Sequence, residues 1–277
     1  MLVASIYNMI VHFDSVINIT SLTVYNTEHL SSFFDNKNTY GVFLIFGVLA
    51  STILKVVTQQ KRWMVFSVIF FTNEVMAMCR TAIILSFALI VFSFYFKSKN
   101  NIRKNILSIV LLIALAILIF KNERINHFVF DSMFYSTDSL DARGSYVDQL
   151  LPLVKGEHFW FGYGKEKALE LAKLYTGNQY YHNGFLKALM VGGVFKLVLQ
   201  ISAVLLSFYY GFKNMRFNKQ VGALCLLSTL IYVIYNFVEA VILFDTPVVS
   251  LTAVLFVITL PIMFNNALIK GESESIT

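Results

Sequence analysis

The stretch Gln179-Tyr180-Tyr181-His182-Asn183-Gly184 separates the longest polar segment of the chain from a long apolar run. The polar segment, residues 121–182, is 62 residues long and carries seven basic and eight acidic side chains. The apolar run at residues 194–210 approaches the roughly 20 residues that a helix needs to cross a bilayer. The boundary therefore places His182 at the edge of a membrane.

The composition supports an integral membrane protein. Of the 277 residues, 57% are apolar and only 14% are charged, and a soluble domain of this size seldom contains so little charge. The apolar runs are uninterrupted and lack the alternation of a membrane barrel strand, so they predict helices, whose backbone groups are satisfied internally. We expect an all-α, polytopic helix bundle with about 7 spans and one large periplasmic loop.

The order of apolar and polar segments predicts five regions. Residues 1–36 form either a weak span or an interfacial segment, and the sequence leaves both possibilities open. The other regions are the spans of 37–120, the loop of 121–182, the interfacial helix and spans of 183–264, and a cytoplasmic tail, 265–277. Within the loop, residues 138–154 and 165–175 favour helices. The predicted spans are 40–57, 63–79, 81–96, 106–120, 194–210, 221–244 and 248–264.

Basic residues in the short loops predict the orientation. Three loops that alternation places on one side contain lysine and arginine but no acidic residue: Lys55, Lys61 and Arg62; Lys97, Lys99, Arg103 and Lys104; Lys213, Arg216 and Lys219. The excess of positive charge in cytoplasmic loops assigns that side to the cytoplasm and the 121–182 loop to the outside, which is the periplasm of a Gram-negative cell. Topology also explains the net charge of +6 better than nucleic-acid binding does.

Several kinds of site receive no support. Cys79 and Cys225 lie in separate apolar runs without metal-type spacing, so neither a disulfide nor a zinc site is expected. No second histidine or carboxylate stands at a metal-ligand spacing from His182. The chain also lacks a glycine-rich phosphate loop and a serine elbow, and we predict no cofactor and no metal.

Three polar residues share the predicted outer boundary of the membrane: Arg80, Arg143 and His182. An arginine there can hold phosphate oxygens through its fixed donors, although arginines at span ends also commonly snorkel and those on loop helices are usually solvated. Histidine can take a proton from a hydroxyl and release it near neutral pH. A lone histidine serves more often as a structural hydrogen-bonding group.

Two carboxylates stand in apolar surroundings. Glu74 precedes Arg80 by less than two helical turns, so we expect it to pair with that arginine and orient it. Glu239 together with Asp245 is expected to form either an acidic patch near the outer mouth of the bundle or simply a pair of carboxylates in water.

Four stretches, in order, resemble the O-antigen ligase and polymerase family of membrane glycosyltransferases. Asn36-Lys37-Asn38 before Tyr40-Gly41 is similar to the family's "nKN" motif, and Cys79-Arg80-Thr81-Ala82 is similar to its "SRTA". Arg143 followed by Gly162-Tyr163-Gly164 resembles part of the large periplasmic loop. Tyr181-His182-Asn183-Gly184-Phe185-Leu186, with Gly192-Gly193 behind it, resembles "HNxxL" and its trailing glycine.

The resemblance implies a metal-independent glycosyltransferase in the bacterial inner membrane. Arg80, Arg143 and Asn183 would bind the diphosphate of an undecaprenyl-diphosphate-linked oligosaccharide, and His182 would activate the acceptor hydroxyl or assist its attack by hydrogen bonding. Its partners would be lipid-linked donor and acceptor glycans, membrane lipid and a chain-length regulator. Polymerisation of O-antigen or capsule repeat units is the expected reaction.

Other functions remain open at this stage. Within the same family, the chain could be an O-antigen ligase or a protein O-oligosaccharyltransferase. From a different class, it could be a polysaccharide transporter or flippase component. The chain departs from the family at Cys79, where serine is usual, and at Val147, where a tryptophan often stands. Few residues precede the "nKN" motif, so we expect either a short member or the C-terminal part of a split gene, which would be inactive alone.

Overall fold

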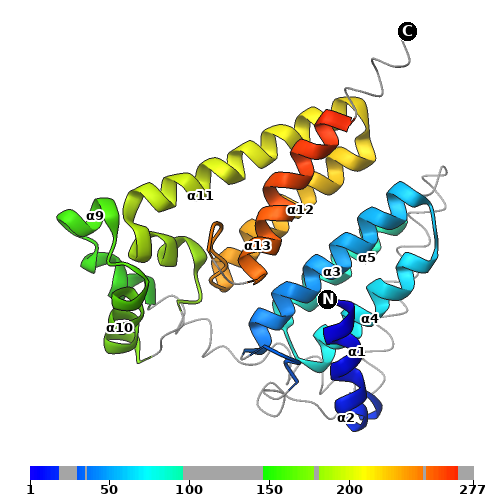
Figure 1. Cartoon of the computed structure of the whole chain (residues 1–277), viewed down its shortest axis with the longest axis horizontal. Coiled ribbons are helices and arrows are strands. Elements are labelled where there is room, and N and C mark those ends of the chain that lie inside the picture. Colours follow the sequence, from blue (N-terminus) through cyan, green and yellow to red (C-terminus); the bar gives the residue numbers. More distant parts are fainter. Residues whose placement is uncertain (19–29, 35, 96–145, 178–180, 246–247, 268–277) are drawn as a thin grey trace, which may run out of the picture. The chain divides into compact units, whose positions relative to one another are not determined.

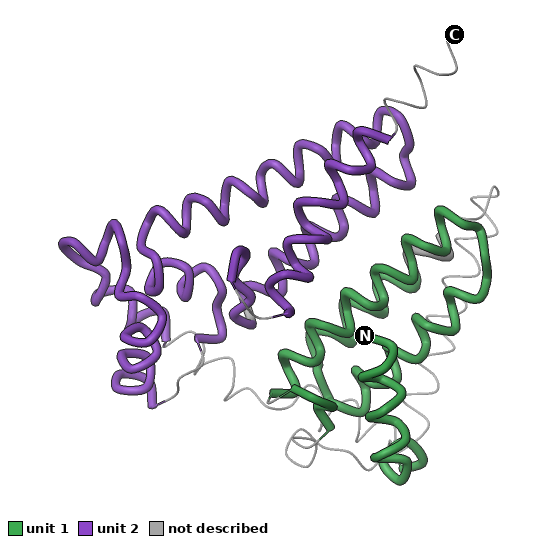
Figure 2. The backbone as a smooth tube through the Cα atoms, in the orientation of Figure 1, with its two compact units in different colours: residues 1–137 green, residues 138–277 purple. Residues whose placement is uncertain are grey.

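The computed structural model describes residues 1–18, 30–34, 36–95, 146–177, 181–245 and 248–267. All of its regular elements are helices. The chain divides into two compact units, Met1–Thr137 and Asp138–Thr277, each with its own packing (Figure 2). The predicted span at 106–120 lies outside the described residues, as do Arg143 and the first part of the 138–154 helix.

Within unit 1, three apolar helices pack together: α3 (Lys37–Thr58), α4 (Arg62–Met76) and α5 (Arg80–Tyr95) (Figure 1). Asn36 caps the start of α3, because its side-chain oxygen accepts a 2.7 Å hydrogen bond from the Asn38 amide. Ser51 of α3 and Ser67 of α4 share a hydrogen bond of 2.6 Å.

Two glycines of α3 allow its neighbours to come close. A Cβ added to Gly41 would lie 2.7 Å from Cβ of Cys79, and one added to Gly47 would lie 2.9 Å from the ring of Phe70. Small residues commonly permit such close approach between helices in membranes, where packing replaces the hydrophobic effect.

The N-terminal residues form two short helices, α1 (Leu2–Val11) and α2 (Phe13–Ile17). A buried polar contact joins α1 to the bundle: the Asn8 amide donates to Asn73 Oδ1 of α4 at 3.0 Å, and Tyr40 OH donates to the same oxygen at 3.1 Å. With ten residues, α1 is shorter than a bilayer crossing requires. Within unit 1, α1 is therefore joined to α4 by a hydrogen bond between buried polar side chains.

Unit 2 is built around α11 (Gly184–Phe217), α12 (Lys219–Val238) and a last helix that begins as α13 (Val248–Val254). The last helix continues through a π-helical turn, η4 (Leu255–Thr259). Ser207 and Thr229 hydrogen-bond between α11 and α12, and Asn214 donates to the carbonyl of Pro261 at 2.9 Å.

Four helices of the described residues are long and apolar enough to cross a membrane: Lys37–Thr58, Gly184–Phe217, Lys219–Phe237 and Val248–Ala267. They correspond to four of the predicted spans. The helices at two further predicted spans are shorter, since α4 has 15 residues and α5 has 16.

Much of the surface of α11 is apolar and exposed within the described residues. Phe195, Leu205 and Phe212 are each more than half exposed, whereas a soluble helix would place polar side chains on such a face. The sequence also predicted the interruption near its start, and Gly193 indeed breaks the helix with φ 65° and ψ −164°.

Candidate active site

His182 faces Glu239 in unit 2. The Nδ1 atom of His182 lies 3.5 Å from Oε1 of Glu239, and both side chains are largely sheltered, with 16% and 15% of their surface exposed. The ring of Tyr146 stacks on the imidazole, with 5.8 Å between centroids and 21° between planes. A carboxylate and an aromatic ring thus flank the imidazole within unit 2.

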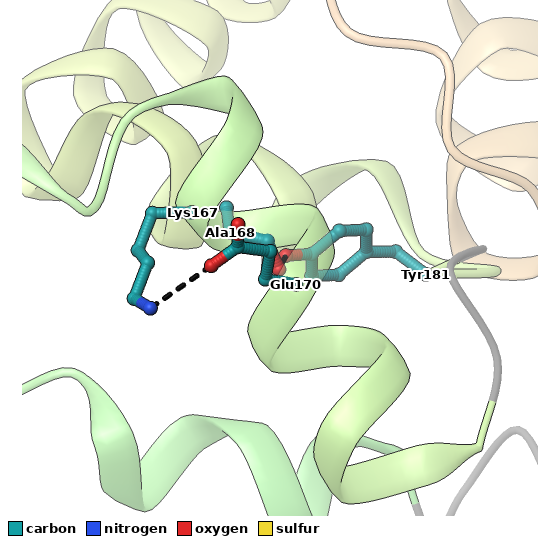
Figure 3. A network of polar contacts seen from close by, with 4 residues as sticks. All are labelled: Lys167, Ala168, Glu170 and Tyr181. Atoms are coloured by element: carbon teal, nitrogen blue, oxygen red, sulfur yellow. Dashed lines mark hydrogen bonds and ion pairs between the residues drawn. The ribbon is translucent and has the colours of Figure 1, made fainter.

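Tyr181, the residue before His182, attaches the chain to α10 (Lys165–Thr176). Tyr181 is 1% exposed, and its hydroxyl donates a hydrogen bond to the carbonyl of Ala168 in α10, as Figure 3 shows. Burial raises the pKa of the Tyr181 phenol above its ordinary value, so the phenol stays protonated and able to donate. This contact ties the start of the His182 segment to a separate helix.

Asn183 and Gly184, the residues after His182, set the start of α11 and its contact with α12. Asn183 is the N-cap of α11, and its Oδ1 accepts from the Leu186 amide at 2.9 Å. Gly184 follows against α12, where an added Cβ would stand only 1.7 Å from Oδ1 of Asn236. Asn183 therefore has a structural task in starting the helix, and its predicted role in substrate binding remains a prediction.

His182 itself adopts a left-handed backbone conformation, with φ 49°. Among residues with a side chain, this conformation is most accessible to asparagine, aspartate and histidine. The sharp reversal between the buried Tyr181 and the capped helix start therefore occurs at the histidine. Backbone strain of this kind often accompanies functional positions.

A backbone-to-backbone contact holds α9 (Glu157–Phe161) and the glycines after it against the kink of α11. The Tyr163 amide donates to the Met190 carbonyl at 2.8 Å, and the Gly164 amide donates to the Val191 carbonyl at 3.0 Å. These bonds join Gly162-Tyr163-Gly164 to the residues just before Gly192-Gly193, which belong to a different motif of the sequence.

Arg80 is the first residue of α5 in unit 1 and is half-buried. A tight turn precedes it, in which Met78 has φ 51° and the Arg80 amide donates to the Met78 carbonyl at 3.0 Å. Cys79 lies against the start of α3, with its Sγ 2.8 Å from the Lys37 carbonyl oxygen. The departure from serine at position 79 thus retains a side chain that can donate to that carbonyl.

Glu74 is fully buried in α4, where Ser86 of α5 donates a 2.7 Å hydrogen bond to its Oε1. The expected pairing of Glu74 with Arg80 stays a prediction, and the bond to Ser86 gives the carboxyl group a role in joining α4 to α5. Arg143 lies outside the described residues, so its part in the site also remains a prediction.

Glu239 is the site residue whose role the sequence did not reveal. It stands 57 positions after His182, a separation that no helical or strand periodicity connects. An acidic patch of Glu239 and Asp245 stays a prediction. In the structure Glu239 lies near His182, and Asp245 Oδ1 lies 3.7 Å from Nζ of Lys165. In the part of the chain that the structure describes, no group of three or more histidine, cysteine, aspartate or glutamate side chains could hold a metal ion.

Comparison with known proteins identifies the family. Residues 65–201 match the family model described as O-antigen ligase. A search of curated proteins and a search of solved structures each found no significant match. The matched range includes Arg80, Arg143 and His182, and it ends before Glu239. The chain is therefore a membrane protein with transmembrane helices that carries an O-antigen ligase family domain at residues 65–201.

Proposed function

We propose that this protein is a repeat-unit polymerase of O-antigen or capsule. It transfers glycan from undecaprenyl diphosphate to a sugar hydroxyl of another lipid-linked unit. The observation that supports the proposal most directly is the contact of His182 with Glu239, in which Nδ1 lies 3.5 Å from Oε1 and both side chains are sheltered. His182 lies within the matched range and Glu239 lies beyond it. A general base of this kind is what the transfer of a sugar to a hydroxyl needs.

The chemistry uses His182 as the base. The reaction requires a neutral imidazole with its proton on Nδ1, the nitrogen 3.5 Å from the Glu239 carboxylate, so that Nε2 keeps its lone pair for the acceptor hydroxyl. The hydroxyl oxygen attacks the anomeric carbon of the donor glycan while its proton passes to Nε2. The bond from that carbon to the diphosphate oxygen breaks, and undecaprenyl diphosphate leaves with the electron pair. The proton on His182 then returns to solvent.

The remaining predicted residues serve the leaving group. As the family resemblance implies, Arg80 and Arg143 would bind the diphosphate and offset the charge that develops on it, which removes the need for a metal ion. Asn183 would contribute to substrate binding, and Glu74 would orient Arg80. Glu239 acts as a positioning residue, because it holds His182 without touching the reacting atoms.

The proposed setting is the bacterial inner membrane. The basic loops orient the chain with about 7 spans, with the 121–182 loop and His182 on the periplasmic side. Lipid-linked donor and acceptor glycans, together with a chain-length regulator, are the proposed partners.

The test is His182→Asn in a strain whose surface polysaccharide depends on this gene copy. Asparagine accepts the left-handed backbone at this position, so the variant removes the proton acceptor while keeping the turn. Loss of general-base catalysis lowers the rate by a factor of about 100 to 10,000. We therefore expect the ladder of long chains to disappear, while His158→Asn, at an exposed histidine of the same unit, keeps it. A full ladder in His182→Asn would show that the catalytic assignment is wrong.

A second candidate is the ligase reaction, which the description of the matched family favours. This reaction moves a finished glycan onto a lipid core or a protein. The same His182→Asn strain separates the two, because loss of a polymerase leaves single repeat units attached to the core, whereas loss of a ligase leaves none.

A further inference from the structure

Three consecutive aromatic side chains at the end of α9 are exposed. Phe159, Trp160 and Phe161 expose 42%, 49% and 72% of their surface. They are the last residues of this short helix, which stands beside the kinked end of α11 in Figure 1. Isolated apolar residues on a protein surface are normal, whereas a contiguous apolar patch marks a site of interaction.

The apolar patch continues onto α11. The rings of Trp160 and Phe161 both lie against the ring of Phe195, with 5.8 Å and 5.4 Å between centroids. Phe195 is 57% exposed and stands just beyond the kink. Val198 and Leu199 follow it by three and four residues, so they share its face of the helix, and each is 53% exposed. The exposed end of α9 and this face of α11 therefore form one apolar surface.

The charged residues of α11 indicate where the edge of a bilayer falls. Residues 197–212 contain no charged side chain and lie between Lys196 and Lys213. At a rise of about 1.5 Å per residue this stretch is about 24 Å long, which is most of the roughly 30 Å hydrocarbon core. A lysine at the end of a span extends its ammonium group toward the headgroups. Because Lys196 directly follows Phe195, the rings that pack on Phe195 lie at the level of that edge.

Close backbone contacts hold α9 in this place. A Cβ added to Gly193 would lie 2.2 Å from the carbonyl oxygen of Trp160, and one added to Gly162 would lie 2.6 Å from the backbone nitrogen of Gly192. The two backbones therefore pack directly on each other, with no side chain between them. Movement of α9 away from α11 would also break the two hydrogen bonds that the residues after α9 donate to Met190 and Val191.

We propose that the end of α9 is an interfacial membrane anchor. Phe159, Trp160 and Phe161, together with Phe195, are here named the aromatic anchor, and their partner is the lipid at the boundary between headgroups and acyl chains. An apolar surface that is continuous with a spanning helix and ends beside a lysine meets the bilayer at this boundary. Aromatic residues, tryptophan above all, are enriched there, because the ring is apolar and the indole N–H can still meet water.

The aromatic anchor has a consequence for the candidate active site. The first part of α11 runs from the residue after Asn183 to the kink, so His182 is joined to the anchor through a short, capped stretch of helix. A kink held at the lipid boundary sets the depth of His182 relative to the bilayer. The anchor itself depends on packing and exposure, and it does not rest on the reaction proposed for His182.

The experiment uses the fluorescence of Trp160 in the full chain. The protein contains two tryptophans, Trp63 and Trp160, so Trp63→Phe leaves one indole and changes no residue of the unit that contains α9. This variant is reconstituted into liposomes of phosphatidylethanolamine and phosphatidylglycerol, with part of the lipid brominated either near the headgroup or deep in the acyl chain. We expect the strongest quenching from the shallow bromines, weaker quenching from the deep ones and little from acrylamide in the water.

Three other results overturn the proposal. Quenching by acrylamide without quenching by brominated lipid would place Trp160 in water. Protection from both quenchers would show that another polypeptide, from this chain or a second protein, covers the aromatic anchor. Stronger quenching by deep than by shallow bromines would place the ring in the hydrocarbon core instead of at its boundary. This measurement requires no substitution in α9 and no enzymatic turnover, so its failure is distinguishable from failure of the transferase proposal.

A charge placed in the aromatic anchor tests the role of its most exposed ring. In the Trp63→Phe chain, Phe161→Glu should shift the emission of Trp160 to longer wavelength and reduce its quenching by shallow bromines, because a carboxylate at this place favours water over lipid. Phe161→Leu should retain the quenching. Leu174→Glu is the matched control, since it places the same charge at an apolar residue of α10 that is 76% exposed. Equal quenching in Phe161→Glu and Leu174→Glu would overturn the proposal.

Discussion

The Nδ1 atom of His182 lies 3.5 Å from Oε1 of Glu239, which joins the start of α11 to the end of α12. The pair links a residue inside the matched family range to one beyond it. The ring of Tyr146 also lies beside the imidazole, with 5.8 Å between the two ring centroids. Orientation of a general base by a second group is a recurring feature of catalytic sites.

Glu239→Gln should separate positioning from structure. The amide keeps the size of the side chain but loses the charge that orients the imidazole, so we expect kcat for glycan transfer to fall by about tenfold or more, with KM and the melting temperature near their wild-type values. Glu239→Asp should recover part of the lost rate. A parallel fall in kcat and thermal stability, without recovery in the aspartate variant, would assign Glu239 a structural role alone.

Gly193→Ala should be strongly destabilising. At φ 65° and ψ −164° the position is accessible essentially to glycine only, and an added Cβ would lie 2.2 Å from the Trp160 carbonyl oxygen. Strain and overpacking together should cost about 2 kcal/mol or more of unfolding free energy.

Gly177→Ala provides the control. Gly177 also has a positive φ, 70°, but a Cβ added there would have no neighbouring atom within 4 Å. Its substitution should therefore cost only about 1 to 2 kcal/mol, from the left-handed backbone alone. Thermal unfolding in detergent measures both variants, and equal losses would show that the contact between α9 and the α11 kink contributes nothing.

Gly184→Ala should be rescued by a second substitution. A Cβ at position 184 would meet Asn236 Oδ1 at 1.7 Å, so alanine should destabilise the unit by about 1 to 3 kcal/mol. Asn236→Ala alone should cost about 1 kcal/mol, because it removes the 2.9 Å bond from Asn236 to the Tyr232 carbonyl.

The double variant tests the contact itself. Gly184→Ala with Asn236→Ala should be more stable than Gly184→Ala alone, since the shorter side chain makes room for the new methyl group. Thermal unfolding of the wild type, the two single variants and the double variant gives the coupling free energy between positions 184 and 236. Additive losses would place Asn236 away from the start of α11.

Tyr181→Phe should change how stability depends on alkaline pH. Burial raises the pKa of the Tyr181 phenol in the folded protein, so the unfolded chain loses this proton first, near its ordinary pKa of about 10. The contribution of the phenol is complete below that pH and is lost as the pH rises, by up to about 1.4 kcal/mol per unit.

The measurement is thermal unfolding between neutral and strongly alkaline pH. At neutral pH, Tyr181→Phe should cost about 1 kcal/mol, because the hydrogen bond to the Ala168 carbonyl is lost. Above about pH 10, its stability should fall less steeply than that of the wild type. Parallel curves would mean that Tyr181 does not titrate differently in the two states.

The sequence by itself determined the helical membrane class, four of the long spans, the break at Gly193 and the family. These depend on local properties, namely the length of an apolar run, the conformational preference of glycine, and motifs whose residues are close in the chain. Only the tertiary structure paired His182 with Glu239 and Lys165 with Asp245. The packing of helices decides which residues far apart in the chain become neighbours. The periodicity of a single segment predicts only that segment's own helix or strand, so it could not predict these pairs.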